Sequence, residues 1–128
     1  MAALTYFKRC SGSGETATGF DNPASGGLDI DKDGHLVTVS YSTPAVYVYS
    51  GCRPACKLIG GPFPLKGTGF YGHLNMDSTS FVAADYQHGE IDVYRYTPTS
   101  LKYMYSFNNG LSQSSGVVGA AYNPSSKE

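Results

Sequence analysis

The chain has 128 residues, of which 41% are hydrophobic and 15% charged, and its formal net charge is −1 at pH 7. This balance excludes a charge-rich disordered chain, and without a basic excess we expect no nucleic-acid partner. No apolar run reaches the roughly 18 residues of a membrane span, and the first ten residues lack the apolar core of a signal peptide. We therefore expect a single globular domain over residues 1–128, with no membrane partner.

Glycine, proline and tyrosine are abundant, with 16, 7 and 11 residues, and no useful stretch has apolar residues at helical spacing. This composition favours short strands joined by turns, so the predicted fold class is all-β. Alternating apolar and polar residues predict a series of antiparallel strand pairs. In chain order they are 3–9 with 15–20, the hairpin 27–40, 45–51 with 55–61, the hairpin 73–86, and 90–96 with 101–107.

The two single-segment hairpins resemble each other. An offset of 46 residues places Asp31 on Asp77 and Leu36 on Val82, and a third copy begins at Gly119. The unit is then four antiparallel strands in about 42–46 residues, which is the size of a β-propeller blade. The domain would consist of about three permuted repeats, at 1–44, 45–89 and 90–128.

The recurring pattern is a small apolar residue, any residue, an apolar residue, Asp or Asn, any two residues, and Gly or Ser. It resembles the repeats of bacterial six-bladed β-propellers of the NHL and SMP-30/lactonase-like type, from about Leu4 to Pro124. Propellers close with about four to eight blades, so the resemblance implies a half-propeller. The alternative is an ordinary β-sandwich with regularly spaced turns.

Both ends of the predicted array are apolar, with Leu4 and Tyr6 at one end and Tyr122 at the other. Terminal repeats normally need polar caps. We therefore expect two copies to form a homodimer that closes a six-bladed ring, with the tail strand near 117–123 joining the partner's head strands near 3–20. The alternative is a fragment of a larger extracellular propeller.

Three cysteines are present, and Cys52 and Cys56 bracket a predicted hairpin turn, where facing residues can approach disulfide distance. Two alternatives are open. A Cys52–Cys56 disulfide would indicate an oxidising compartment, secreted or periplasmic, whereas two reduced thiols would not. The location itself is not predicted.

Asp29, Asp31, Asp33 and Gly34 match the opening of an EF-hand calcium loop, but Ser40 occupies the position of the bidentate glutamate. We expect a hairpin turn there rather than a calcium site. No cofactor and no metal ligand is predicted.

The expected function is that of a binding or interaction scaffold, with a small molecule or a peptide as ligand. Inner strands of a propeller line its axial channel, and turns on one face form its usual binding surface. The candidate ligand-binding residues are Asp29, Tyr71, His73 and Asn75 at the channel, and Asp85 and His88 at a turn.

No catalytic residue is predicted. The alternative function is a lactonase-like or lyase-like enzyme with a channel metal, for which the resemblance implies Glu, Asn and Asp in the channel. Here the third copy offers only Ala121, and no inner-strand glutamate is present.

Overall fold

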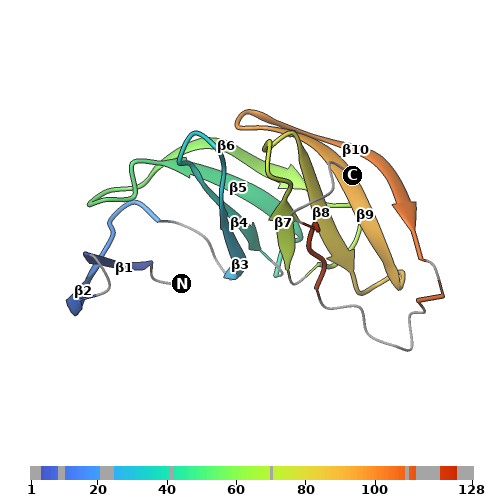
Figure 1. Ribbon diagram of the computed structural model, residues 1–128, viewed down its shortest axis with the longest axis horizontal. Helices are drawn as coiled ribbons and strands as arrows, with labels where there is room; N and C mark the ends of the chain where they lie inside the picture. Colours follow the sequence, from blue (N-terminus) through green and yellow to red (C-terminus); the bar gives the residue numbers. More distant parts are fainter. Residues whose placement is uncertain are drawn as a thin grey trace.

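The computed structural model describes residues 4–8, 11–20, 25–40, 42–69, 71–108, 110–111 and 119–123. Their regular secondary structure is entirely β, in three antiparallel sheets, which confirms the expected all-β class (Figure 1). Within these ranges there is no helix with the length and apolar character needed to cross a membrane.

Each sheet joins strands that follow one another along the chain. The head sheet contains β1 (Thr5–Lys8) and β2 (Ser11–Thr16). The first meander contains β3 (Ser25–Ile30), β4 (Leu36–Ser40), β5 (Ala45–Ser50) and β6 (Lys57–Pro64). The second meander contains β7 (Gly72–Leu74), β8 (Ser80–Asp85), β9 (Glu90–Thr97) and β10 (Ser100–Phe107).

The predicted strand pairs within the two meanders agree with the observed strands. The predicted repeat boundaries at 44/45 and 89/90 fall inside the sheets, between β4 and β5 and between β8 and β9. The predicted head pair is shifted, because Lys8 pairs with Ser11 and the second strand therefore starts earlier than expected. Thr18, placed in that strand by the sequence, forms an isolated bridge with Ala55 instead.

The two meanders pack face to face, and their contact forms the largest apolar core among the described residues (Figure 1). β4 and β5 contribute valines from one side, while β8 and β9 contribute mainly aromatic side chains from the other. The buried members are Val37, Val39, Val46, Val48, Phe81, Ala83, Tyr94 and Tyr96. Burial of apolar surface is the dominant favourable term in folding, so this contact holds the two sheets together.

The second and third strands of the two meanders pair in the same register, 45 residues apart. Val37 pairs with Val48 as Val82 pairs with Val93, and Val39 pairs with Val46 as Ala84 pairs with Ile91. The outward face of the second meander therefore carries the counterparts of the four valines that the first meander buries.

The predicted offset of 46 residues is wrong for the hairpins. Ile30 pairs with Leu36 as Leu74 pairs with Phe81, so the first strands are 44 residues apart and the second strands 45. The difference is a turn that is one residue longer in the second hairpin. Asp31 consequently corresponds to Asn75 rather than to Asp77.

The third copy expected from Gly119 does not form a sheet strand within the described residues. We call residues 119–123 the tail segment. Ala120 and Tyr122 pack against β8 and β9, but the segment belongs to none of the three sheets. The expected strand residues 117 and 118 lie outside the described ranges.

Gly60 in β6 allows the two meanders to approach closely. A Cβ atom at this position would lie 2.1 Å from the carbonyl oxygen of Pro98, in the turn between β9 and β10. The clash is with backbone, so it could be relieved only by moving one sheet relative to the other. Gly19 is confined in the same way, because its Cβ would lie 2.2 Å from the carbonyl oxygen of Cys56.

We expect Gly60→Ala to lower the free energy of unfolding by about 2 kcal/mol, because the added methyl group forces the meanders apart. Urea denaturation followed by circular dichroism measures this. Thr99→Ala is the control, since Thr99 is exposed on the same turn as Pro98, and it should change stability by less than about 0.5 kcal/mol. Equal stabilities for the two variants would contradict the packing described here.

Candidate functional site

Asp29 connects the first strands of the two meanders. Its Oδ2 accepts a hydrogen bond from the backbone N–H of Leu74 at 2.8 Å and lies 3.6 Å from Nδ1 of His73. The structure thus brings together two predicted site residues. The Asp29 carboxylate holds β7 against β3, whereas the His73 side chain remains 44% exposed. Tyr71, immediately before β7, is also exposed.

Asn75, another predicted ligand-binding residue, is buried in the turn between β7 and β8. Its Oδ1 accepts hydrogen bonds from the backbone N–H groups of Thr79 and Ser80, and its Nδ2 donates to Thr79 Oγ1. A side chain that bonds its own backbone in this way stabilises a tight turn. Asn75 therefore builds the turn instead of offering its amide to a ligand.

Asp31 has the same role in the turn between β3 and β4, which confirms the expected hairpin turn. Its Oδ1 accepts hydrogen bonds from the backbone N–H groups of Asp33 and His35. Its Oδ2 accepts one from the Tyr96 hydroxyl at 2.9 Å and lies 2.9 Å from His35 Nδ1. The aspartate-rich turn is thereby bonded to β9 of the second meander.

Two opposing effects act on the pKa of Asp31. Burial raises it, but the hydrogen bonds from His35, Tyr96 and Asp33 outweigh burial, so the pKa is lowered below its ordinary value of 3.8. The resulting stabilisation of the folded state is present above pH 3.8 and is lost as the pH falls through the lowered pKa.

Asp85 and His88, predicted together at a turn, are in contact between β8 and β9. Asp85 Oδ1 accepts a hydrogen bond from the His88 backbone N–H, and Asp85 Oδ2 lies 2.7 Å from His88 Nδ1. The Asp85 side chain is fully buried, while the His88 side chain is 42% exposed. Only the imidazole of this pair is therefore accessible to a ligand.

A second buried carboxyl group, that of Asp92 in β9, is absent from the predicted site residues. Ser106 Oγ donates a hydrogen bond to Asp92 Oδ1 at 2.5 Å, and Lys66 Nζ lies 3.9 Å from the same oxygen. Lys66 Nζ also donates to Glu90 and to Ser106. The network joins the segment after β6 to β9 and β10.

Burial raises the pKa of Asp92 from 3.8 to about 6, and the hydrogen bond and negative charge of Asp85 act in the same direction. The Ser106 hydrogen bond and the Lys66 charge oppose this rise. Asp85 and Asp92 are each 1% exposed, so they do not contact a ligand in this conformation.

The one sequence signal for this network is Asp92 itself. It occupies the position of Tyr47, 45 residues earlier, in a strand whose neighbouring positions are apolar or aromatic. A carboxylate in such a strand needs partners. Lys66 lies 26 residues away from Asp92 in a connecting segment, and no spacing rule relates the two positions.

Among the described residues, two groups of three side chains have potential metal-ligand atoms within 4.8 Å of one another. They are Asp31 with Asp33 and His35, and Asp85 with His88 and Glu90. In each group the buried carboxylate already accepts at least one hydrogen bond from a backbone N–H group of its own turn. These are the contacts of capped turns, and we assign a metal to neither group.

We expect Asp92→Asn to flatten the dependence of stability on pH between about pH 4 and 6. In the wild type the folded state binds the Asp92 proton more tightly than the unfolded state does, so the contribution of Asp92 to stability falls as the pH rises through this window and levels off above it. The difference removed is on the order of 2 kcal/mol. Urea denaturation at a series of pH values measures it.

Asp77→Asn, at an exposed turn position, is the matched control and should keep the wild-type slope. A wild-type slope in Asp92→Asn as well would show that Asp92 does not hold its proton in the folded state.

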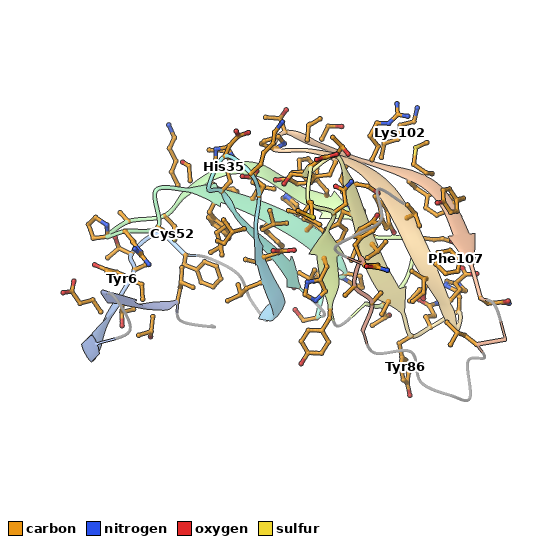
Figure 2. All side chains as sticks on the ribbon, in the orientation of Figure 1. Tyr6, His35, Cys52, Tyr86, Lys102 and Phe107 are labelled. Carbon is orange, nitrogen blue, oxygen red and sulfur yellow. A yellow bond between two sulfur atoms is a disulfide. The ribbon has the colours of Figure 1, made fainter. Side chains whose placement is uncertain are left out.

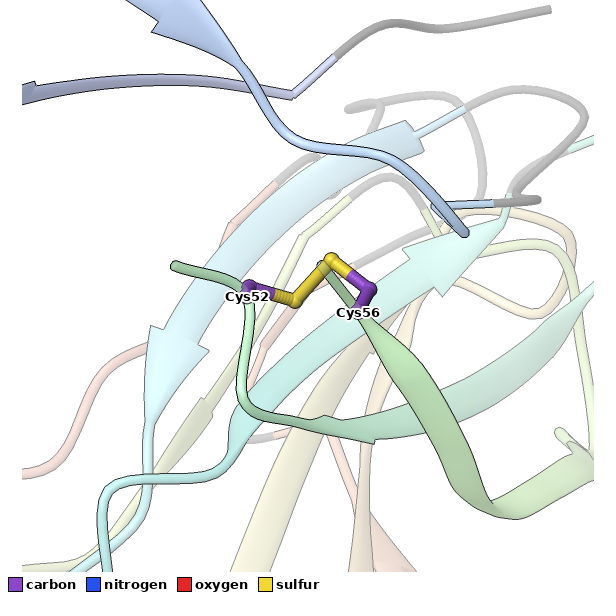
Figure 3. The surroundings of a disulfide bond; sticks show 2 residues. All are labelled: Cys52 and Cys56. Carbon is purple, nitrogen blue, oxygen red and sulfur yellow. A yellow bond between two sulfur atoms is a disulfide. The ribbon is translucent and has the colours of Figure 1, made fainter. Parts of the chain in front are cut away.

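Cys52 and Cys56 form a disulfide in the turn between β5 and β6, one of the two predicted alternatives (Figure 3). The same turn supports the segment that follows the head sheet. Thr18 donates its backbone N–H to Pro54 and accepts one from Cys56, and Arg53 lies over the ring of Tyr6. The disulfide therefore fixes the surface on which the head sheet rests.

We expect the double variant Cys52→Ser, Cys56→Ser to lose about 2 kcal/mol of stability, the chain-entropy value for so short a loop. Because the turn supports Thr18, the amide of Thr18 should also lose protection from hydrogen exchange. Cys10→Ser is the control for loss of a thiol. Unchanged protection at Thr18 would contradict the anchoring role of the turn.

The outward face of the second meander forms a groove of about 1060 Å³. Apolar side chains of β8, β9 and β10 line it, and the tail segment lies along it. Among the lining residues are Val82, Ile91, Val93, Met104, Tyr105 and Phe107. Tyr105 is 57% exposed. We call this surface the tail face.

A second groove, of about 510 Å³, lies at the opposite end of the array. It is lined by Leu4 and Tyr6 of the head and by Ile30, Leu36 and Tyr49 of the first meander. We call this surface the head face. Figure 2 shows its Tyr6 and the Phe107 of the tail face at opposite ends of the molecule.

Comparison with known proteins identifies no relative. No family model matches the chain, and no curated protein or solved structure matches it.

Proposed function

We propose that the protein is an interaction scaffold of the β-propeller type, in which two copies close a six-bladed ring. The observation that carries this proposal is the recurrence of the sheet-to-sheet interface. Val37, Val39, Val46 and Val48 are covered by the second meander. Their counterparts 45 residues later are Val82, Ala84, Ile91 and Val93, which are at most 8% exposed, and the partly buried hydrophobic residues packed against that cluster in the described part of the chain are Ala120 and Tyr122.

The head face supports the same proposal from the other side. Leu74 in β7 packs into the core between the meanders. Its counterpart in β3, Ile30, is 57% exposed. On the side of Ile30, the described residues include no strands equivalent to those that bury Leu74. The two-stranded head sheet covers only part of this face.

A second copy supplies what each face needs. The head sheet of another copy would cover the tail face. The tail segment of that copy would take the position of the inner strand that is missing at the head face. A two-fold axis makes both junctions identical. Two meanders and one composite sheet per chain then give six blades, within the range of about four to eight at which propellers close.

One position on the tail face differs from the interface between the meanders. Tyr105 pairs with Val93 where Gly60 pairs with Val48, and Gly60 is the residue that accommodates the Pro98 turn. β1 has four residues, whereas β5 and β9 have six and eight. A shorter docked sheet leaves space for the Tyr105 ring.

In such a ring, Tyr71 and His73 would face the axial channel, and His88 would lie on one rim. These exposed side chains, each present twice, are suited to a small polar molecule or a peptide. The disulfide favours an oxidising compartment as the place of function.

We expect light scattering on a sizing column to give twice the chain mass of 13.6 kDa. Tyr105→Lys on the tail face and Ile30→Lys on the head face should each give a monomer, because each buries a charge at a junction. A mixture of these two variants should recover a heterodimer, since one intact junction remains. Met76→Lys is the control, because Met76 is 74% exposed in a turn.

A wild-type monomer would overturn the ring. Dimers that persist in both Tyr105→Lys and Ile30→Lys would place the interface elsewhere. Open-ended aggregation would instead favour a piece of a larger propeller.

A further inference from the structure

We propose that the tail segment of one protomer pairs along its edge with β1 of a second copy, so that the composite sheet consists of the tail segment, β1 and β2. This inference rests on the proposed ring and names the backbone contact that closes it. Three observations carry it: the conformation of the tail segment, the charges on the other sheet edges, and the position of the head sheet.

The tail segment has the placement of a sheet strand. Ala120 and Tyr122 pack against β8 and β9, while the intervening Ala121 is exposed. Alternation with a period of two is the signature of an extended strand lying on an apolar surface. The Tyr122 hydroxyl is hydrogen-bonded to Ser80 Oγ of β8, which holds the segment in place.

The counterpart of the tail segment in the second meander is β7, which packs on the first meander and pairs with β8. Residues 119–122 have no strand beside them in any sheet of the described part of the chain. A strand held on a surface with an open backbone edge is a template for strand addition from another chain.

The outer edges of the two meanders carry residues that discourage such addition. β6 contains Lys57, Pro62 and Pro64, and β10 contains Lys102. Lysine and proline on edge strands oppose pairing with other chains. Residues 119–123 contain neither, and they carry no charge. The tail segment is thus an edge without this protection, and β1 contains one such residue, Lys8, at its end.

The head sheet is the partner that gains most from a third strand, because a two-stranded sheet is marginally stable by itself. The chain that leaves β2 is already engaged, since Thr18 pairs with the disulfide turn. Within the described residues, β1 pairs only with β2. The head sheet packs on the first meander and the tail segment on the second, so they lie on opposite sides of the contact between the meanders and this pairing requires a second copy (Figure 1).

The direction of the pairing follows from the meanders. First and third strands of an antiparallel meander run the same way, and the tail segment and β1 correspond to the first and third strands. We therefore expect a parallel pairing, stabilised by main-chain hydrogen bonds.

Proline substitution tests the backbone contact. Successive N–H groups of a strand point to opposite edges, so Ala120→Pro and Ala121→Pro each remove a donor from a different edge. We expect one of the two proline variants to have a dimer dissociation constant at least tenfold higher than that of the serine variant at the same position, as measured by sedimentation. Both proline variants retain Tyr122 and its contact with β8.

Cross-linking tests the proximity without depending on stability. In a Cys10→Ser background, chains with Thr5→Cys are mixed with chains with Ala121→Cys and treated with a short bismaleimide. We expect a covalent heterodimer from this pair, and none when Met76→Cys replaces Thr5→Cys. A wild-type dimer that gives no such cross-link and tolerates both proline variants would overturn this inference but leave the ring intact. A wild-type monomer would overturn both.

Discussion

The contact between the two meanders is the interaction on which the rest of the structure depends. Four valines of β4 and β5 lie against Phe81, Ala83, Tyr94 and Tyr96 of β8 and β9. Each sheet alone would leave an apolar face in water, so neither is stable without a neighbour. The outward face of the second meander carries apolar residues at the same positions and in the same register, so it too is suited to pack against another sheet. The proposed ring supplies that sheet by symmetry.

Polar residues that look like ligands in the sequence act mainly as connectors between these sheets. Asp29 bonds the backbone of β7, and Asp31 accepts the Tyr96 hydroxyl. Asp85 and Asp92 place two carboxyl groups inside the second meander, and that of Asp92 lies 3.9 Å from Lys66. Buried carboxylates must be paired or hydrogen-bonded, and each of these is. The side chains that remain accessible are those of Tyr71, His73 and His88.

Strand pairs and side-chain alternation were predictable because they depend on neighbouring residues. Val46 and Val48 point to one side and Tyr49 to the other, as the period of two predicts. The predicted repeat offset is wrong because the second hairpin turn, which begins at Asn75, is one residue longer than the first, which begins at Asp31, and this difference is visible only in the strand pairing. The contact between Lys66 and Asp92 was not predictable. Lys66 lies in the segment that connects the two meanders, and no local sequence pattern relates that segment to β9.

The most direct test of this account is an experimental structure of the protein in its assembled state. We expect Val82, Ala84, Ile91 and Val93 to be covered by the head sheet of a second copy, with β1 beside the tail segment. The account would be contradicted if this face were open to solvent, or covered by a part of the same chain other than the tail segment.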